Sequence, residues 1–122
     1  MRTLLKLSFI LLTFTFIGNT AASQESINSS NALDYVGQNV NICGALAQIK
    51  DFKKGIYLNI DRDYPNQTIT FVIWDNNLER IEKEWGSFRS LKSKTVCASG
   101  KVNTYKGKPR ISINSSYDFT VK

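Results

Sequence analysis

The sequence predicts an all-β domain in which one helix separates the third of five strands from the fourth. Three observations predict it. Apolar residues alternate with polar ones along most of the chain after residue 38, which is the period of half-buried strands. Helical spacing appears in one segment, residues 76–85. The two cysteines occupy matching positions in the first and fourth predicted strands.

The N-terminal residues 1–23 predict a signal peptide. Arg2 and Lys6 precede an uncharged run, residues 7–17, and small residues follow it. A membrane-spanning helix needs about 20 apolar residues, and this run is roughly half as long. We therefore expect cleavage near Ala22 or Ser23 and a periplasmic or secreted product. Residues 24–34 are polar and rich in Ser and Asn, which predicts a flexible leader, and the domain is expected over residues 35–122.

The first predicted strand spans residues 38–48, where Val40, Ile42 and Leu46 share one parity. Gly44 in its middle predicts a bulge or a sharp bend. The other strands are predicted by the same alternation at residues 56–60, 68–74, 94–105 and 110–113. In the helix, Leu78, Ile81 and Trp85 recur at helical spacing, and Asn76 with Glu79 predicts a capping box.

This arrangement matches the OB-fold, a five-stranded Greek-key barrel. In that barrel the first and fourth strands are neighbours. Cys43 and Cys97 both have the parity opposite to the apolar residues of these strands, so their side chains can approach closely enough for a disulfide. An oxidising compartment makes the bridge the default interpretation, and two unrelated buried thiols are the alternative.

Six segments in this order carry a resemblance to a known family: residues 35–38, 40–44, 63–67, 71–74, 96–100 and 105–111. Together they resemble exported bacterial OB-fold domains similar to the anticodon-binding type, some of which are found beside micrococcal-type nuclease domains. The resemblance covers nearly all of residues 35–116. It implies the barrel and nucleic-acid binding, and it implies no catalytic residues.

Charge is distributed unevenly. The chain has a net charge of +6. In the segment from Gly86 to Lys122, Asp118 is the single acidic residue among eight basic ones. Such a segment favours anionic partners such as nucleic acid, and a solvated face that maintains solubility is the alternative.

Catalysis is not expected. The sequence contains no histidine, the commonest general base and zinc ligand. Asp61 and Asp63 could hold calcium or serve as an acid/base pair, but calcium takes six or more oxygen ligands and a charged loop is usually only solvated. Arg62 lies between them, yet its surroundings do not resemble the catalytic motif of micrococcal-type nucleases. We expect no cofactor and no metal site.

Binding is the expected function. OB domains take extended ligands across strands two and three and between two flanking loops. Binders of single strands combine cations with aromatic side chains that stack on bases. The candidate nucleic-acid-binding residues at these places are Lys50, Phe52, Lys53, Lys54, Tyr57, Asn59, Thr70, Tyr105, Lys106, Lys108 and Arg110. The alternatives are ordinary packing roles for Phe52 and Tyr57 and, for the whole domain, an accessory function in the cell envelope with a protein or glycan partner. A nuclease is a possible protein partner.

Overall fold

The computed structural model describes Thr13 and residues 25–122. Apart from Thr13, the predicted signal peptide lies outside the described residues. Within the described part of the chain, no helix combines the length and the apolar character that crossing a bilayer requires.

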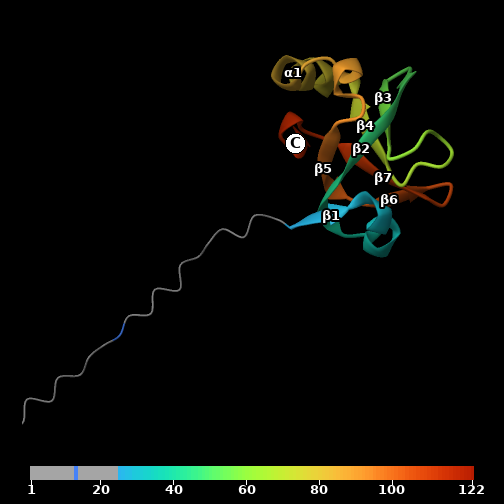
Figure 1. The fold of residues 1–122 in the computed structure, drawn as a ribbon, viewed down its shortest axis with the longest axis vertical. Coiled ribbons are helices and arrows are strands. Elements are labelled where there is room, and N and C mark those ends of the chain that lie inside the picture. The colour runs from blue at the N-terminus through green and yellow to red at the C-terminus, as the bar shows by residue number, and fades with distance from the viewer. Residues whose placement is uncertain (1–12, 14–24) are drawn as a thin grey trace, which may run out of the picture.

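The domain consists of eight strands, one α-helix and three short 3-10 helices (Figure 1). The strands are β1 (Ser26–Asn28), β2 (Asn39–Phe52), β3 (Gly55–Ile60), β4 (Thr70–Trp74), β5 (Thr95–Lys101), β6 (Asn103–Tyr105), β7 (Lys108–Ile113) and β8 (Phe119–Val121). The helices are η1 (Ser29–Tyr35), α1 (Asp75–Trp85), η2 (Phe88–Leu91) and η3 (Ser116–Asp118).

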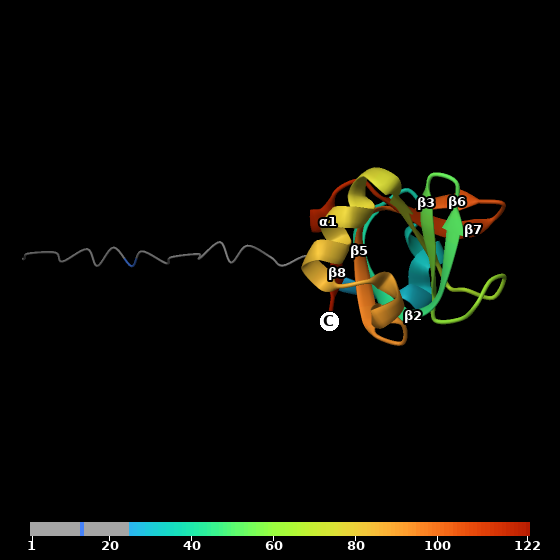
Figure 2. The same cartoon turned by 90° about the horizontal axis from the view of Figure 1, so that it is seen from above.

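The strands form one sheet in the order β6-β7-β4-β3-β2-β5-β8, with β1 added parallel to β2. Figure 2 shows that this sheet is curved. The sheet over residues 25–122 is not closed, because no ladder joins the two ends of this order. The predicted five-stranded barrel is therefore wrong in two respects, because over these residues the sheet is open and has eight strands. The predicted fourth strand is divided into β5 and β6 at Val102, which instead forms a bridge with Val36, and β1 and β8 are additional short strands.

The long strand β2 changes its inward-facing parity at a bulge. Its register against β3 shifts between Leu46 and Gln48. Before the shift the even-numbered Ile42 and Leu46 are fully buried, whereas after it the even-numbered Lys50 is exposed. A bulge re-aims the side chains that follow it. The predicted irregularity is therefore present, but it lies beyond Gly44 and directs the end of β2 toward the outer face.

The core consists of apolar side chains on the inward face of the strands and of α1. Leu58 and Phe71 are fully buried and oppose each other in the β3–β4 ladder, as the predicted alternation requires. Ile81 of α1 is also fully buried. The predicted helix is present, but the capping box is wrong. The helix begins at Asp75, and its N-cap residue, Trp74, makes no side-chain capping bond.

The segment predicted to be a flexible leader is part of the fold. Strand β1 pairs with β2, and Ser29 and Ala32 of η1 are buried. The side chain of Asn28 accepts a hydrogen bond from the Ser30 backbone N–H at the start of η1. Ser and Asn satisfy local backbone groups in this way, so a polar composition is compatible with an ordered segment.

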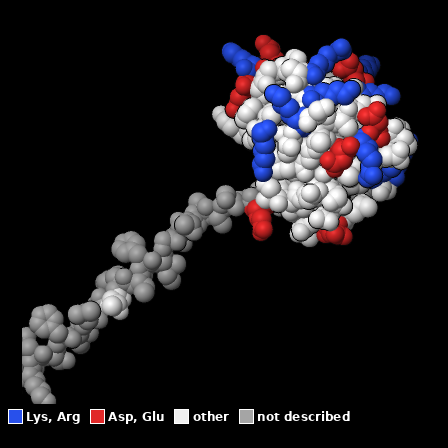
Figure 3. Space-filling model, viewed as in Figure 1, with Lys and Arg blue, Asp and Glu red and all other residues white. Residues whose placement is uncertain are grey.

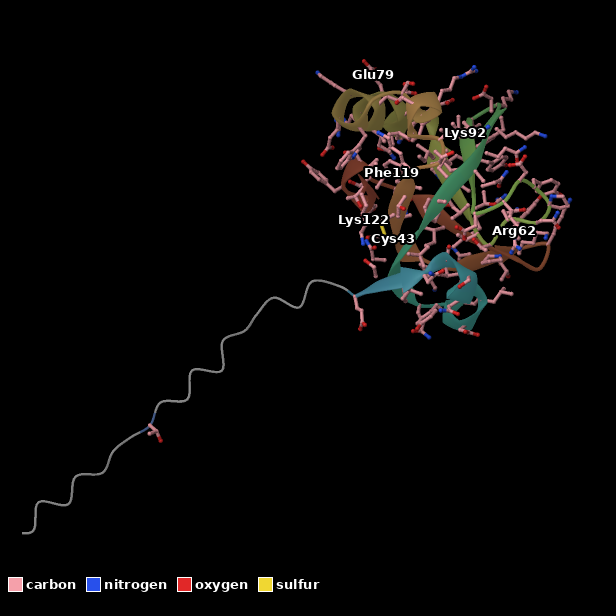
Figure 4. All side chains as sticks on the ribbon, in the orientation of Figure 1. Cys43, Arg62, Glu79, Lys92, Phe119 and Lys122 are labelled. Carbon is pink, nitrogen blue, oxygen red and sulfur yellow. A yellow bond between two sulfur atoms is a disulfide. The ribbon has the colours of Figure 1, made fainter. Side chains whose placement is uncertain are left out.

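The predicted disulfide joins Cys43 of β2 to Cys97 of β5. The two residues are direct partners in the antiparallel β2–β5 ladder, and their Cα atoms are 4.1 Å apart. Figure 4 shows this bridge at Cys43, away from Arg62 on the loop between β3 and β4. The expected adjacency of the two predicted strands is confirmed.

Candidate functional site

A cavity of about 380 Å³ lies on the outer face of the sheet. It is formed by side chains from β2, β3, β4, β6 and β7 together with the loop that joins β3 to β4. Its lining comprises Lys50, Tyr57, Asn59, Tyr64, Gln67, Thr70, Tyr105, Lys106, Lys108, Pro109 and Arg110. The structure thus brings together the predicted site residues except Phe52, Lys53 and Lys54.

Strand register explains this convergence. Asn59 of β3 pairs with Thr70 of β4, and Thr70 pairs in turn with Arg110 of β7. Lys50 of β2 is the partner of Tyr57 in β3. Side chains of paired residues on one face of a sheet are close neighbours. Residues more than fifty positions apart in the sequence therefore meet at one place.

Buried polar side chains make the floor of the cavity. Asn59 is 3% exposed and Thr70 is 6% exposed. The Thr70 hydroxyl donates a hydrogen bond to Asn59 Oδ1 at 2.9 Å, and Asn59 Nδ2 donates to Gln48 Oε1 at 2.8 Å. Gln67 Nε2 donates to Thr70 Oγ1 at 3.1 Å. These bonds satisfy groups that have lost water, as buried polar groups require.

Aromatic rings and cations are stacked beside this floor. The Arg110 guanidinium carbon lies 5.1 Å from the centre of the Tyr57 ring and 4.3 Å from that of Tyr105. Lys106 Nζ lies 5.5 Å from the centre of the Tyr105 ring. Cations within about 6 Å of a ring face are attracted to its π electrons. Arg110 is thereby held between two tyrosines while its charge stays at the cavity.

The loop from Asp61 to Ile69 makes one wall of the cavity. Lys108 Nζ donates a hydrogen bond to the Pro65 carbonyl oxygen and so connects β7 to this loop. The Tyr64 backbone N–H donates to Gln48 Oε1 at 2.9 Å. The sequence predicts that Lys108 contacts a ligand, and in this structure its ammonium group also positions the wall.

Three predicted residues lie outside the cavity lining. Lys53 and Lys54 are exposed at the turn between β2 and β3. Phe52 is half-buried and stacks on Tyr57, with ring centroids 4.2 Å apart, and it makes a T-shaped contact with Trp74. The turn extends the strand pair past the end of the cavity, so the two lysines are carried beyond it. Phe52 supports the Tyr57 ring by stacking on it.

Tyr64, Gln67 and Pro109 line the cavity but are absent from the predicted site. The first two belong to a segment whose composition indicates only a loop. Tyr64 carries an aromatic signal, and its side chain is 62% exposed. Its position beside Lys108 depends on how the loop folds back over the sheet, which sequence periodicity does not describe.

Asp61, at the start of the acidic loop, is held by hydrogen bonds from neighbouring segments. Among residues 25–122 and Thr13, no group of three potential metal ligands lies close together. Burial alone would raise the pKa of the Asp61 carboxyl. Hydrogen bonds from Ser29, Thr68 and the Ala45 N–H, together with the charge of Arg62, outweigh burial and lower this pKa below its ordinary value. Asp61 connects η1 to the β3–β4 loop and has a structural role.

The charge of the cavity lining differs from that of the face of the domain that Figure 3 shows. Figure 3 shows Lys and Arg side chains interspersed with Asp and Glu on the visible face of the domain. The cavity, as the described residues form it, is lined by four cations and by no carboxylate. An anion in the cavity would therefore meet cations and no acidic side chain.

Comparison with known proteins identifies similar folds. No family model matches the chain, and no curated protein matches it. A chain of the S. pombe Stn1-ten1 complex is similar with a TM-score of 0.51 and 20% identity over 69% of this chain. Asparaginyl-tRNA synthetase from Pyrococcus horikoshii is similar with a TM-score of 0.56 and 20% identity over 80% of this chain. The OBody AM1L10, solved bound to hen egg-white lysozyme, has a TM-score of 0.56 and 14% identity over 81% of this chain.

The extent of these matches differs. The match covers 93% of the OBody chain, 57% of the Stn1-ten1 chain and 23% of the synthetase chain. At such identities the similarity concerns the fold. Together with the sheet order and the helix between β4 and β5, it shows that residues 25–122 contain an OB-fold domain whose sheet is open and carries additional short strands.

Proposed function

We propose that this domain is a non-catalytic binding module that takes single-stranded nucleic acid into the cavity of its outer face. The observation that carries the proposal is the stack of Tyr57, Arg110 and Tyr105 in a cavity lined by cations. Aromatic faces suit bases, and cations suit the phosphates between them. The solved neighbours include an aminoacyl-tRNA synthetase, which supports this use of the fold.

Export is part of the same proposal. The predicted signal peptide and the disulfide agree with a periplasmic or secreted site of action. There the bridge would persist, because thiols are not kept reduced as they are in the cytosol.

A protein ligand is the second candidate. The OBody to which the chain is similar was solved bound to lysozyme, so this fold also presents surfaces to proteins. Tyr64 and Tyr105 are 62% and 54% exposed at the cavity, and tyrosine is frequent at protein interfaces. Because the described residues that line the cavity include four cations and no carboxylate, nucleic acid is favoured over protein as the ligand.

The test is fluorescence anisotropy with labelled oligothymidylate over a salt series. We expect binding at low salt. The logarithm of the association constant should fall linearly with the logarithm of the salt concentration, with a slope of about 0.7 for each neutralised phosphate. Arg110→Ala should weaken binding about tenfold, which corresponds to about 1.4 kcal/mol. The matched control is Arg80→Ala, because Arg80 is exposed on α1 and does not line the cavity. Absence of binding at low salt would overturn the proposal and favour a protein partner.

A further inference from the structure

The side-chain amide of Gln67 has one atom with a partner and one without. Its Nε2 donates to Thr70 Oγ1 at the cavity floor. Its Oε1 is buried and accepts no hydrogen bond from the described residues. Gln67 lines the cavity. A buried acceptor without a donor is unfavourable, so this oxygen is a place where a ligand donor would gain a bond that the free protein lacks.

The orientation of the Gln67 amide is determined by a chain of hydrogen bonds that begins at a backbone group. The Tyr64 N–H can only donate, so the atom of Gln48 that receives it is the oxygen. Asn59 donates to that same oxygen through Nδ2 and therefore presents Oδ1 to Thr70.

The Thr70 hydroxyl uses its single proton on Asn59 Oδ1, so it accepts from Gln67. Gln67 must use its nitrogen for this bond. Its oxygen is consequently the atom left over, and reversing the amide would break the bond to Thr70. The chain thus presents an acceptor, and not a donor, at this point of the cavity.

We infer that Gln67 is a specificity-determining residue that accepts a hydrogen bond from an N–H group on the edge of a nucleobase bound in the cavity. The inference rests on the proposed function and deepens it. The oxygen is buried in the free protein, so the bond to the base requires that the Gln67 side chain turn Oε1 toward the cavity that it lines. A base stacked near Tyr57 and Tyr105 would then be held by its face and by one edge, and a base whose edge lacks that N–H would leave the oxygen unpaired.

The experiment compares two probes of equal charge and similar stacking: oligothymidylate, and the same oligomer with every thymine methylated at N3. Methylation removes the imino N–H. We expect the wild-type protein to bind the methylated oligomer about tenfold more weakly, a typical effect of one hydrogen bond to a buried acceptor. In Gln67→Met, which has similar length and no acceptor amide, the two oligomers should bind within about twofold of each other.

Gln38→Met is the matched control, because Gln38 is exposed and lies outside the cavity lining. It should keep the tenfold preference. Equal binding of both oligomers to the wild-type protein would overturn the inference while leaving the proposed function intact, and this comparison needs no variant. A preference that persists in Gln67→Met would also overturn it, since a steric effect of the methyl group would then explain the result. Failure of both oligomers to bind the wild-type protein at low salt would contradict the proposed function itself.

Discussion

The Arg110 guanidinium lies over the Tyr105 ring, with its central carbon 4.3 Å from the ring centre. The two residues belong to the β6–β7 hairpin, in which Arg110 pairs with Asn103 and Tyr105 pairs with Lys108. They are diagonal neighbours across the strands, within reach for long side chains. This contact holds a cation and an aromatic ring together in the cavity lining. The effect expected of removing the Tyr105 ring depends on it.

Tyr105→Ala should weaken binding of oligothymidylate about five- to tenfold, because a base stacked on an aromatic side chain contributes about 1–3 kcal/mol. Tyr117→Ala is the control. Tyr117 is 88% exposed and does not line the cavity. Anisotropy titrations at one salt concentration give both affinities. Similar losses in the two variants would show that exposed aromatic surface in general, and not the stack with Arg110, contributes to binding.

Two pairs of lysines allow the contribution of the cavity to be distinguished from that of the neighbouring turn. Lys50 and Lys106 line the cavity, whereas Lys53 and Lys54 are exposed beyond it. Lys50→Ala combined with Lys106→Ala should lower the salt dependence of oligomer binding by about 0.7 for each phosphate that is no longer neutralised. Lys53→Ala combined with Lys54→Ala removes the same charge and should leave the slope nearly unchanged. Equal slopes in the two double variants would mean that net charge alone governs association.

The disulfide should stabilise the fold without shaping the cavity. Cys43 and Cys97 are 54 residues apart in sequence, and closing a loop of this size stabilises a protein by about 4 kcal/mol in the chain-entropy model. Urea unfolding of the oxidised protein and of the Cys43→Ala, Cys97→Ala variant should differ by about that amount. Oligomer affinity should change less than about twofold, because the bridge lies in the part of β2 that pairs with β5. Two alkylatable cysteines in native exported protein would contradict the bridge.

The Asp61 carboxylate should make stability depend on pH. Its pKa is lowered in the folded state. The contribution of the ionised Asp61 side chain to the free energy of unfolding is therefore fully present above the unfolded-state pKa of aspartate. It is lost as the pH falls through the lower folded-state pKa. Asp61→Asn should reduce the free energy of unfolding by about 1 kcal/mol at neutral pH, since Ser29 and Thr68 both donate to one carboxylate oxygen.

The measurement for Asp61 is urea unfolding at several pH values from neutral to acidic. The difference between wild type and Asp61→Asn should shrink as the pH is lowered. Asp63→Asn is the control, because Asp63 is an exposed residue of the same loop. A constant difference at all pH values would show that the ionised form of Asp61 has no special role.

Strand parity was predictable because burial of one face leaves a period of two in the sequence. The alternation over residues 68–74 places Phe71 in the core and Thr70 on the outer face, as the structure confirms. The register of Cys43 with Cys97 followed from parity and from the neighbourhood of two strands in the predicted fold. The candidate site followed from the places where OB domains bind ligands, namely strands two and three and the two flanking loops.

Other features depend on contacts between distant segments and leave no periodic pattern. The bulge after Leu46 moves Lys50 to the outer face although its parity matches that of buried Ile42. Residues 26–35 belong to the folded domain because β1 pairs with β2 and because Ser29 donates a hydrogen bond to Asp61. The wall formed by Tyr64 and Gln67 depends on how a loop folds back. From composition alone, residues 24–34 were predicted to be a flexible leader, and the segment with Tyr64 and Gln67 was predicted only to be a loop.

The cavity is assembled from strands that reach from β2 to β7, so it exists only while the domain is folded. Any molecule that occupies it must shift the unfolding equilibrium by mass action. At a free concentration a hundred times its Kd, such a molecule would raise the free energy of unfolding by about 2.7 kcal/mol. A rise in melting temperature across a panel of oligonucleotides and small anions would thus rank occupants of this cavity without any assumption about their biological origin.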